Sequence, residues 1–199
     1  MHIKTGAIKV PDTFSSMSSC KLIALSLLVQ LLAACTGIPE HVAPVTGFDA
    51  SRYLGTWYEI ARLDHSFERG LEQVTAEYSF RTDGGIRVVN RGFDPAGNRW
   101  KEAEGKAYFI GPKDVGRLKV SFFGPFYGAY NIIELDKQDY RYALVCGPNK
   151  KYLWILAREP SLDKATMDRL TNKAAALGFD TEQLIFVSQT TAAPKAGTE

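Results

Sequence analysis

Short segments in which apolar and polar residues alternate, separated by turn sequences, fill the chain from Gly55 to about Arg158. The clearest is 74–81, which ends at the turn Thr82-Asp83-Gly84-Gly85. An alternation with a period of two places the apolar side chains of a strand on one face. No helical periodicity interrupts the series, so we predict consecutive antiparallel strands joined by short turns.

The series contains eight predicted strands. They span 55–62, 74–81, 86–93, 100–109, 117–123, 129–135, 140–146 and 151–158. An up-and-down sheet of this size avoids open edges by closing on itself, and an eight-stranded barrel leaves room for one small ligand. We therefore predict an all-β chain built on an eight-stranded antiparallel barrel.

One segment after the strands has helical spacing. In 162–177 the apolar residues Met167, Leu170, Ala174 and Leu177 recur at intervals of three or four. This stripe needs an apolar partner, and the strand at 152–157 is apolar on both faces. We expect one α-helix packed outside the barrel on that strand, then a final strand at 182–188 and a flexible tail at 189–199.

The N-terminal region resembles a bacterial lipoprotein signal. An apolar run at 22–32, too short to cross a bilayer as a helix, follows Lys21 and leads to Leu32-Ala33-Ala34-Cys35. These last four residues resemble the lipobox, whose cysteine receives a diacylglycerol. We predict a signal peptide at 1–34, with Met17 as an alternative start, and lipidation of Cys35. A lipid-anchored tether at 35–47 would then lead into a domain at 48–188.

Charge and cysteine content narrow the functional classes. The whole chain has a net charge of +2, and removal of 1–34 would leave equal numbers of basic and acidic residues. A basic footprint for nucleic acid is therefore absent. With Cys20 cleaved away and Cys35 acylated, Cys146 has no partner for an intramolecular disulfide. The domain must be stabilised by its core.

Three short motifs carry a family resemblance. Gly55-x-Trp57 on the first strand, Asp139-Tyr140 entering the seventh and Arg158 closing the eighth resemble the conserved stretches of the lipocalin family. The stretches 67–71 and 121–128 are most similar to the bacterial outer-membrane lipocalins. The resemblance implies a barrel open at one end that carries fatty acids, lysophospholipids or similar amphiphiles. Gly55, Trp57 and Arg158 would be structural, with the Arg158 guanidinium over the indole of Trp57.

Counting the alternation from Trp57 and Arg158 gives a set of inward-facing candidates for ligand binding. They are Glu59, Ala61, Ala76, Tyr78, Phe80, Leu118, Val120, Phe122, Tyr130, Ile132, Tyr142, Leu144, Tyr152, Trp154 and Leu156. Aliphatic and aromatic carbon with a few hydroxyl groups suits an acyl chain. The alternative is that these side chains fill a solid core, and the residues alone do not separate the two.

The predicted strand directions place the loops at 63–73, 94–98, 124–127 and 147–150 around the open end. We name His65, Phe67, Arg69, Phe126 and Tyr127 as entrance-loop residues. The aromatic residues at 122–127 are too many for a routine turn, so a hydrophobic lip is one interpretation. It would receive lipid, or contact a membrane or a second copy in a homodimer. Packing beneath a neighbouring loop is the other interpretation.

The functional expectation is a non-catalytic carrier that stores or transports lipid for membrane maintenance. After cleavage the chain would keep only His41 and His65, so we expect no metal site, no cofactor and no catalytic triad. The alternative is a lipocalin-type enzyme with Cys146 as its nucleophile. Thr36, where an Asp would favour retention at the inner membrane, favours the outer membrane, and we expect an anchored protein facing the periplasm.

Overall fold

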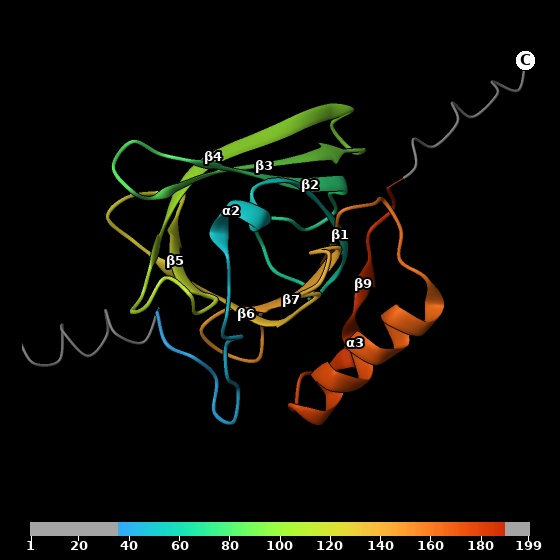
Figure 1. Cartoon of the computed structure of the whole chain (residues 1–199). Coiled ribbons are helices and arrows are strands. Elements are labelled where there is room, and N and C mark those ends of the chain that lie inside the picture. The colour runs from blue at the N-terminus through green and yellow to red at the C-terminus, as the bar shows by residue number, and fades with distance from the viewer. Residues whose placement is uncertain (1–35, 190–199) are drawn as a thin grey trace, which may run out of the picture. The chain divides into compact units, whose positions relative to one another are not determined.

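The structure, a computed structural model, describes residues 36–189 (Figure 1). The predicted signal peptide, Cys35 and nearly all of the predicted tail lie outside this range. Within the described range, no helix is long and apolar enough to cross a membrane. The strands are β1 (Gly55–Arg62), β2 (Glu72–Phe80), β3 (Ile86–Asp94), β4 (Arg99–Phe109), β5 (Arg117–Ser121), β6 (Gly128–Leu135), β7 (Tyr142–Cys146), β8 (Leu153–Ala157) and β9 (Ile185–Phe186).

The sheet closes through β1, which pairs antiparallel with β2 on one side and with β8 on the other. Strands β2 to β8 follow in sequence order between them. The predicted eight-stranded antiparallel barrel is therefore confirmed. The final strand is shorter than predicted, because the 3-10 turn η1 (Thr181–Gln183) precedes a β9 of only two residues that pairs with the end of β1.

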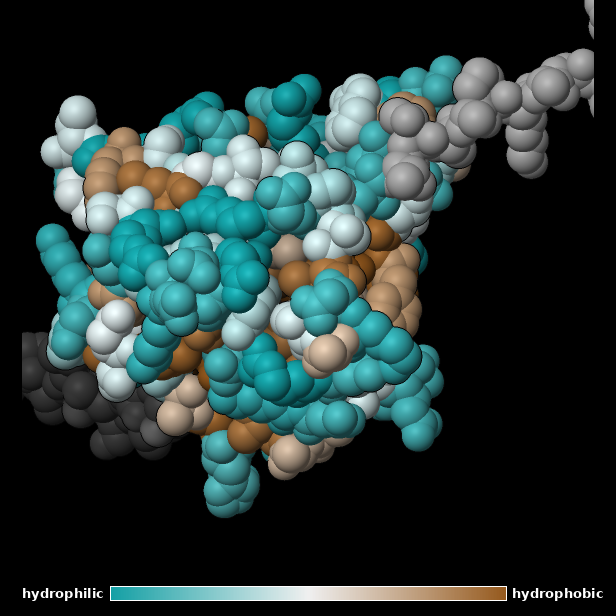
Figure 2. All heavy atoms as spheres, turned by 45° about the vertical axis from the view of Figure 1, so that its right-hand side comes forward, coloured by the Kyte–Doolittle hydropathy of each residue, from teal (hydrophilic) through white to brown (hydrophobic). Residues whose placement is uncertain are grey.

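Two apolar cores lie on the two sides of the barrel wall, one inside the barrel and one outside it. Trp154 and Leu156 of β8 belong to the inner core, whereas Leu153, Ile155 and Ala157 belong to the outer one. The helix α3 (Lys164–Ala176) contributes its buried residues to this outer core, as predicted. Hydrophilic residues dominate the face of the molecule that carries α3 (Figure 2). The helix therefore buries one stripe and presents the opposite one to water.

The closed end of the barrel is held by Arg158. Its guanidinium carbon lies 4.1 Å from the ring centroid of Trp57, and Nη1 donates to the Thr56 carbonyl over 2.8 Å. The short helix α2 (Ala50–Tyr53), which the sequence did not predict, crosses this end (Figure 1). Trp57 Nε1 donates to the carbonyl of Tyr53 over 2.8 Å, so helix and strand are joined at the plug.

The segment predicted as a tether is fastened to the barrel over its described part. The Gly37 carbonyl accepts a hydrogen bond from Asn131 Nδ2 at 3.3 Å, and Val45 N donates to the Ile132 carbonyl at 2.8 Å. Between these two points Val42 packs on the outer core, and just after them Thr46 forms a bridge with Val115. The chain thus lies against the barrel from Gly37 to Thr46, first on the outer core at Val42 and then on the inner core at Val45.

Truncation of a helix residue in the outer core tests how much the helix stabilises the barrel. Leu170 is fully buried, and we expect Leu170→Ala to lower the free energy of unfolding by about 2–5 kcal/mol, because the barrel wall cannot refill the cavity. The matched control is Asn172→Ala on the exposed side of α3, which should change it by less than about 0.5 kcal/mol. Urea unfolding measures both, and equal effects would contradict the packing described.

Candidate functional site

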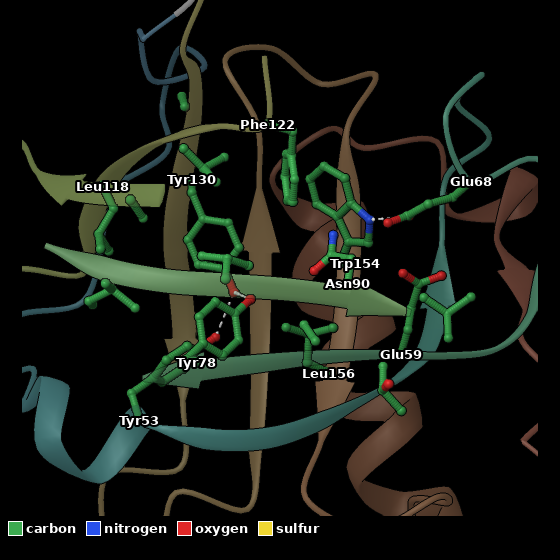
Figure 3. Close-up of a pocket in the computed structure, with 18 of the residues that line it drawn as sticks. Tyr53, Glu59, Glu68, Tyr78, Asn90, Leu118, Phe122, Tyr130, Trp154 and Leu156 are labelled. Atoms are coloured by element: carbon green, nitrogen blue, oxygen red, sulfur yellow. Dashed lines mark hydrogen bonds between the residues drawn. The ribbon is translucent and has the colours of Figure 1, made fainter. Parts of the chain in front are cut away.

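The barrel encloses a cavity with about 840 Å³ of free space, part of it open to solvent. Carbon dominates its wall, with tyrosine hydroxyls at one end, carboxylates at the other and Asn90 between them beside Trp154 (Figure 3). The lining residues are Phe48, Tyr53, Glu59, Phe67, Glu68, Val74, Thr75, Ala76, Tyr78, Ile86, Val88, Asn90, Ala107, Leu118, Val120, Phe122, Ala129, Tyr130, Trp154 and Leu156.

Three tyrosines form the deep end of the cavity. The hydroxyl of Tyr130 lies 2.8 Å from that of Tyr53 and 2.8 Å from that of Tyr78. Burial is the main cause that raises the pKa of all three phenols, so they stay neutral. Their hydroxyl groups satisfy one another, and the rings present carbon to the cavity.

The mouth end of the cavity holds a buried ionic cluster. Arg62 is 1% exposed, and its Nη1 donates to Glu59 Oε1 over 2.7 Å. Its Nη2 donates to the carbonyl of Glu68 over 2.8 Å, which ties the loop after β1 to the strand. The Glu68 carboxylate accepts from Trp154 Nε1 at 3.1 Å and lies 3.0 Å from His65 Nε2.

The two carboxyl groups of the cluster shift in opposite directions. Burial, and then the charge of Glu68, raise the pKa of Glu59 well above its usual range, against the opposing effect of Arg62. Burial also acts to raise the pKa of Glu68, but the contacts with His65 and Trp154 outweigh it and lower the pKa. Glu68 therefore carries the negative charge at the mouth, and Glu59 binds a proton more readily than a free carboxyl does.

Nine of the fifteen candidate ligand-binding residues line this cavity, and six do not. The nine are Glu59, Ala76, Tyr78, Leu118, Val120, Phe122, Tyr130, Trp154 and Leu156. One of them, Phe122, packs against Gly105 of β4, where a Cβ would lie 2.8 Å from the Phe122 ring.

Three of the six belong to the outer core instead. Ala61 faces outward because β1 contains a bulge between Glu59 and Ala61, where the register with β8 shifts by one residue. Tyr142 and Leu144 were assigned the wrong face of β7. Their neighbours Ala143 and Val145 point inward, and because β7 is apolar on both faces its alternation does not reveal the phase.

The other three neither line the cavity nor belong to the outer core. Ile132 is fully buried in the inner core, beside Gly116 and Val45. Phe80 stands in the inward phase, but it ends β2 beyond the wall and is 59% exposed. Tyr152 precedes β8 and lies beside the ring of His65, with 6.1 Å between ring centroids.

The five predicted entrance residues lie in different environments. Phe67 lines the cavity mouth, and Phe126 is exposed. Arg69 pairs with Asp64 at the surface, and Tyr127 lies against Lys119 on the outer wall. His65 was expected in an exposed loop but is 95% buried, because Phe67 stacks on it at 4.0 Å and Glu68 lies beside it.

The sequence reasoning missed several lining residues. Alternation along β3 would have found Ile86, Val88 and Asn90, since all three lie on one face of the strand. Tyr53 and Glu68 offered no such signal. They come from a short helix and a loop, and only the closure of the barrel brings them to the cavity.

Cys146, the nucleophile of the alternative enzyme hypothesis, does not face the cavity. It is fully buried in the outer core, and burial raises the pKa of its thiol to about 12. A thiol in such surroundings is unreactive at neutral pH.

We therefore expect Cys146 to resist an aromatic disulfide reagent in the native protein at pH 8 and to react fully in denaturant. Absorbance of the released thiolate measures this. The test uses a variant that lacks residues 1–35, in which Cys146 is the only cysteine. Rapid native reaction would contradict the burial.

Removal of Arg62 should leave the buried carboxyl groups uncompensated. We expect Arg62→Met to lower the free energy of unfolding at pH 7 by about 3–5 kcal/mol. The loss should be smaller near pH 5, because Glu59, whose pKa is raised, is then protonated and no longer carries a buried charge. Denaturant unfolding measures it at both pH values. The control, Arg69→Met, breaks only an exposed ion pair and should have little effect. Equal losses for both variants would contradict the assigned role of Arg62.

Fold and site together define a class of protein: a small antiparallel barrel with a plugged end, an open end and an apolar cavity between them. Residues 48–189 match the lipocalin-like domain family. The chain belongs to the lipocalin family.

Relatives span bacteria and animals. The chain is 55% identical over 169 residues to the outer membrane lipoprotein Blc of Vibrio cholerae, covering 85% of this chain and 99% of that protein. The Blc protein of Escherichia coli K12 is 52% identical, covering 84% and 96%. Mouse apolipoprotein D is 30% identical, covering 84% and 94%. Insecticyanin from Manduca sexta has a similar fold, with a TM-score of 0.62 at 24% identity, covering 76% of this chain and 86% of that one.

Proposed function

We propose that this lipocalin binds the acyl chain of a fatty acid, lysophospholipid or similar amphiphile inside the barrel. The observation that carries the proposal is the open cavity, whose wall between the tyrosines and the mouth cluster is almost entirely carbon. An apolar chain gains free energy there because it leaves water, and the lining offers it few polar groups to desolvate.

The envelope is the proposed place of action. The bacterial relatives are named outer membrane lipoproteins, and the lipobox-like residues before Cys35 support the same anchoring here. We propose that the lipid on Cys35 holds the barrel at the outer membrane, facing the periplasm, where it stores or transports lipid for membrane maintenance. The proposal is a binding protein without catalysis.

Calorimetric titration of residues 36–199 with a series of acyl chains tests the proposal. Each added methylene should tighten binding by about 0.8 kcal/mol, or about fourfold in Kd, until the cavity is filled. Trp154→Ala should weaken binding of the longest ligand, because the indole lines the cavity and donates to Glu68. The matched control Trp100→Ala removes an exposed indole and should leave affinity unchanged. Affinity that does not change with chain length would contradict the proposal.

The headgroup is tested by comparing a fatty acid with a lysophospholipid of the same chain. A ligand carboxylate at the mouth would lie near the negative Glu68, so we expect the fatty acid to bind more weakly. Glu68→Gln should reduce this difference.

A further inference from the structure

The rim of the open end carries three exposed aromatic side chains. Phe67 is 60% exposed, Phe123 80% and Phe126 72%. Phe67 lies in the β1–β2 loop, and Phe123 and Phe126 lie in the β5–β6 loop. The same two loops reach the cavity, because Phe67 and Phe122 line it. Single apolar residues on a surface are ordinary, but three rings around the mouth of an apolar cavity mark a contact surface. We call Phe67, Phe123 and Phe126 the aromatic rim.

The start of the described chain is fixed near this end of the barrel. Asn131 Nδ2 donates both to the Gly37 carbonyl at 3.3 Å and to the Gly147 carbonyl at 3.2 Å. Gly147 follows β7 directly and begins the β7–β8 loop, which lies on the open side. Pro39 is buried, so the fastening does not depend on one hydrogen bond. Gly37 thus lies beside the middle of β6 and beside the end of β7 that leads into an open-side loop.

Cys35 precedes Gly37 by two residues, a reach of at most about 7 Å. Acyl chains on Cys35 would therefore begin beside the open half of the barrel, and not at the end of a loose spacer. With so short a reach, the bilayer surface that holds those chains would lie against the side of the barrel where Gly37 is fastened, which includes the start of the open-side β7–β8 loop. The placement of the bilayer rests on the proposed lipidation of Cys35.

We propose that the aromatic rim is a docking surface for the phospholipid bilayer and that the fastened segment 37–46 acts as a bracket that holds it there. The rings enter the boundary between headgroups and acyl chains, as aromatic side chains of interfacial proteins do. An amphiphile can then pass between bilayer and cavity with its tail shielded from water. The bracket sets the orientation, and the rim makes the contact.

The test uses the full chain, produced in a bacterial host, reconstituted in phosphatidylethanolamine and phosphatidylglycerol vesicles and examined by mass spectrometry for acylation of Cys35. An environment-sensitive fluorophore is attached to Phe126→Cys at the rim or to Lys113→Cys, an exposed residue of the closed-end loop between β4 and β5. The unsubstituted protein is the labelling control, because Cys146 is buried.

The rim probe should lie about 5–10 Å into the interface and be quenched by lipids with a nitroxide high on the acyl chain, whereas the closed-end probe should not. Insertion of about ten Gly and Ser residues between Thr36 and Gly37 leaves the bracket on the barrel but lengthens its link to Cys35, and should therefore reduce quenching at the rim. Equal quenching at both positions, unchanged quenching after the insertion, or absence of acyl chains on Cys35 would overturn the proposal. Shielding of the rim probe from water by a second copy of the chain, and not by lipid, would also overturn it.

Displacement of a fluorescent fatty acid from the cavity is measured on the same samples. If the fluorescent fatty acid is displaced from the cavity but the rim probe is not quenched, only the docking proposal is overturned. If the fatty acid is not displaced, the proposed function is overturned, whether or not the rim probe is quenched.

Discussion

The double pairing of β1 is the constraint on which the rest of the structure depends. This strand hydrogen-bonds to β2 and β8 and thereby converts an eight-stranded sheet into a barrel. Closure removes both edges of the sheet and separates an inner apolar face from an outer one. It also explains why α3 packs outside: the interior has no room for a helix, and the outer face of β7 and β8 is apolar and needs cover.

The buried ionic cluster at the cavity mouth both carries charge and holds the entrance loop in place. Burial of Glu59, Arg62 and Glu68 costs desolvation energy that their mutual contacts offset only when every partner is present. The bulge of β1 makes the cluster possible, because it turns Ala61 outward and lets Arg62 point to the interior. Arg62 then holds the backbone of the following loop at Glu68, so the entrance is shaped by the same contacts that fix the charges.

The contacts of the N-terminal segment fix the barrel relative to its N-terminus. The sequence predicts a lipid anchor, a tether and a binding domain, whereas the structure fastens the predicted tether to the barrel through Asn131 and Ile132. An anchored barrel with a loose spacer would have no preferred orientation. One with a fastened spacer presents the same side to whatever holds its N-terminus.

The sequence by itself determined the strand series, the external helix, the plug of Trp57 and Arg158, and the inward phase of strands with clear alternation, such as β2 and β5. Local periodicity and short motifs are sufficient for these features because each depends on neighbouring residues. Only the tertiary structure decided the phase of β7, which is apolar on both faces, the bulge that displaced Ala61, and the burial of His65. It also assembled Tyr53 and Glu68 into the site. Those features depend on pairing across the closed barrel, and contacts between residues far apart in the chain leave no periodic signal in it.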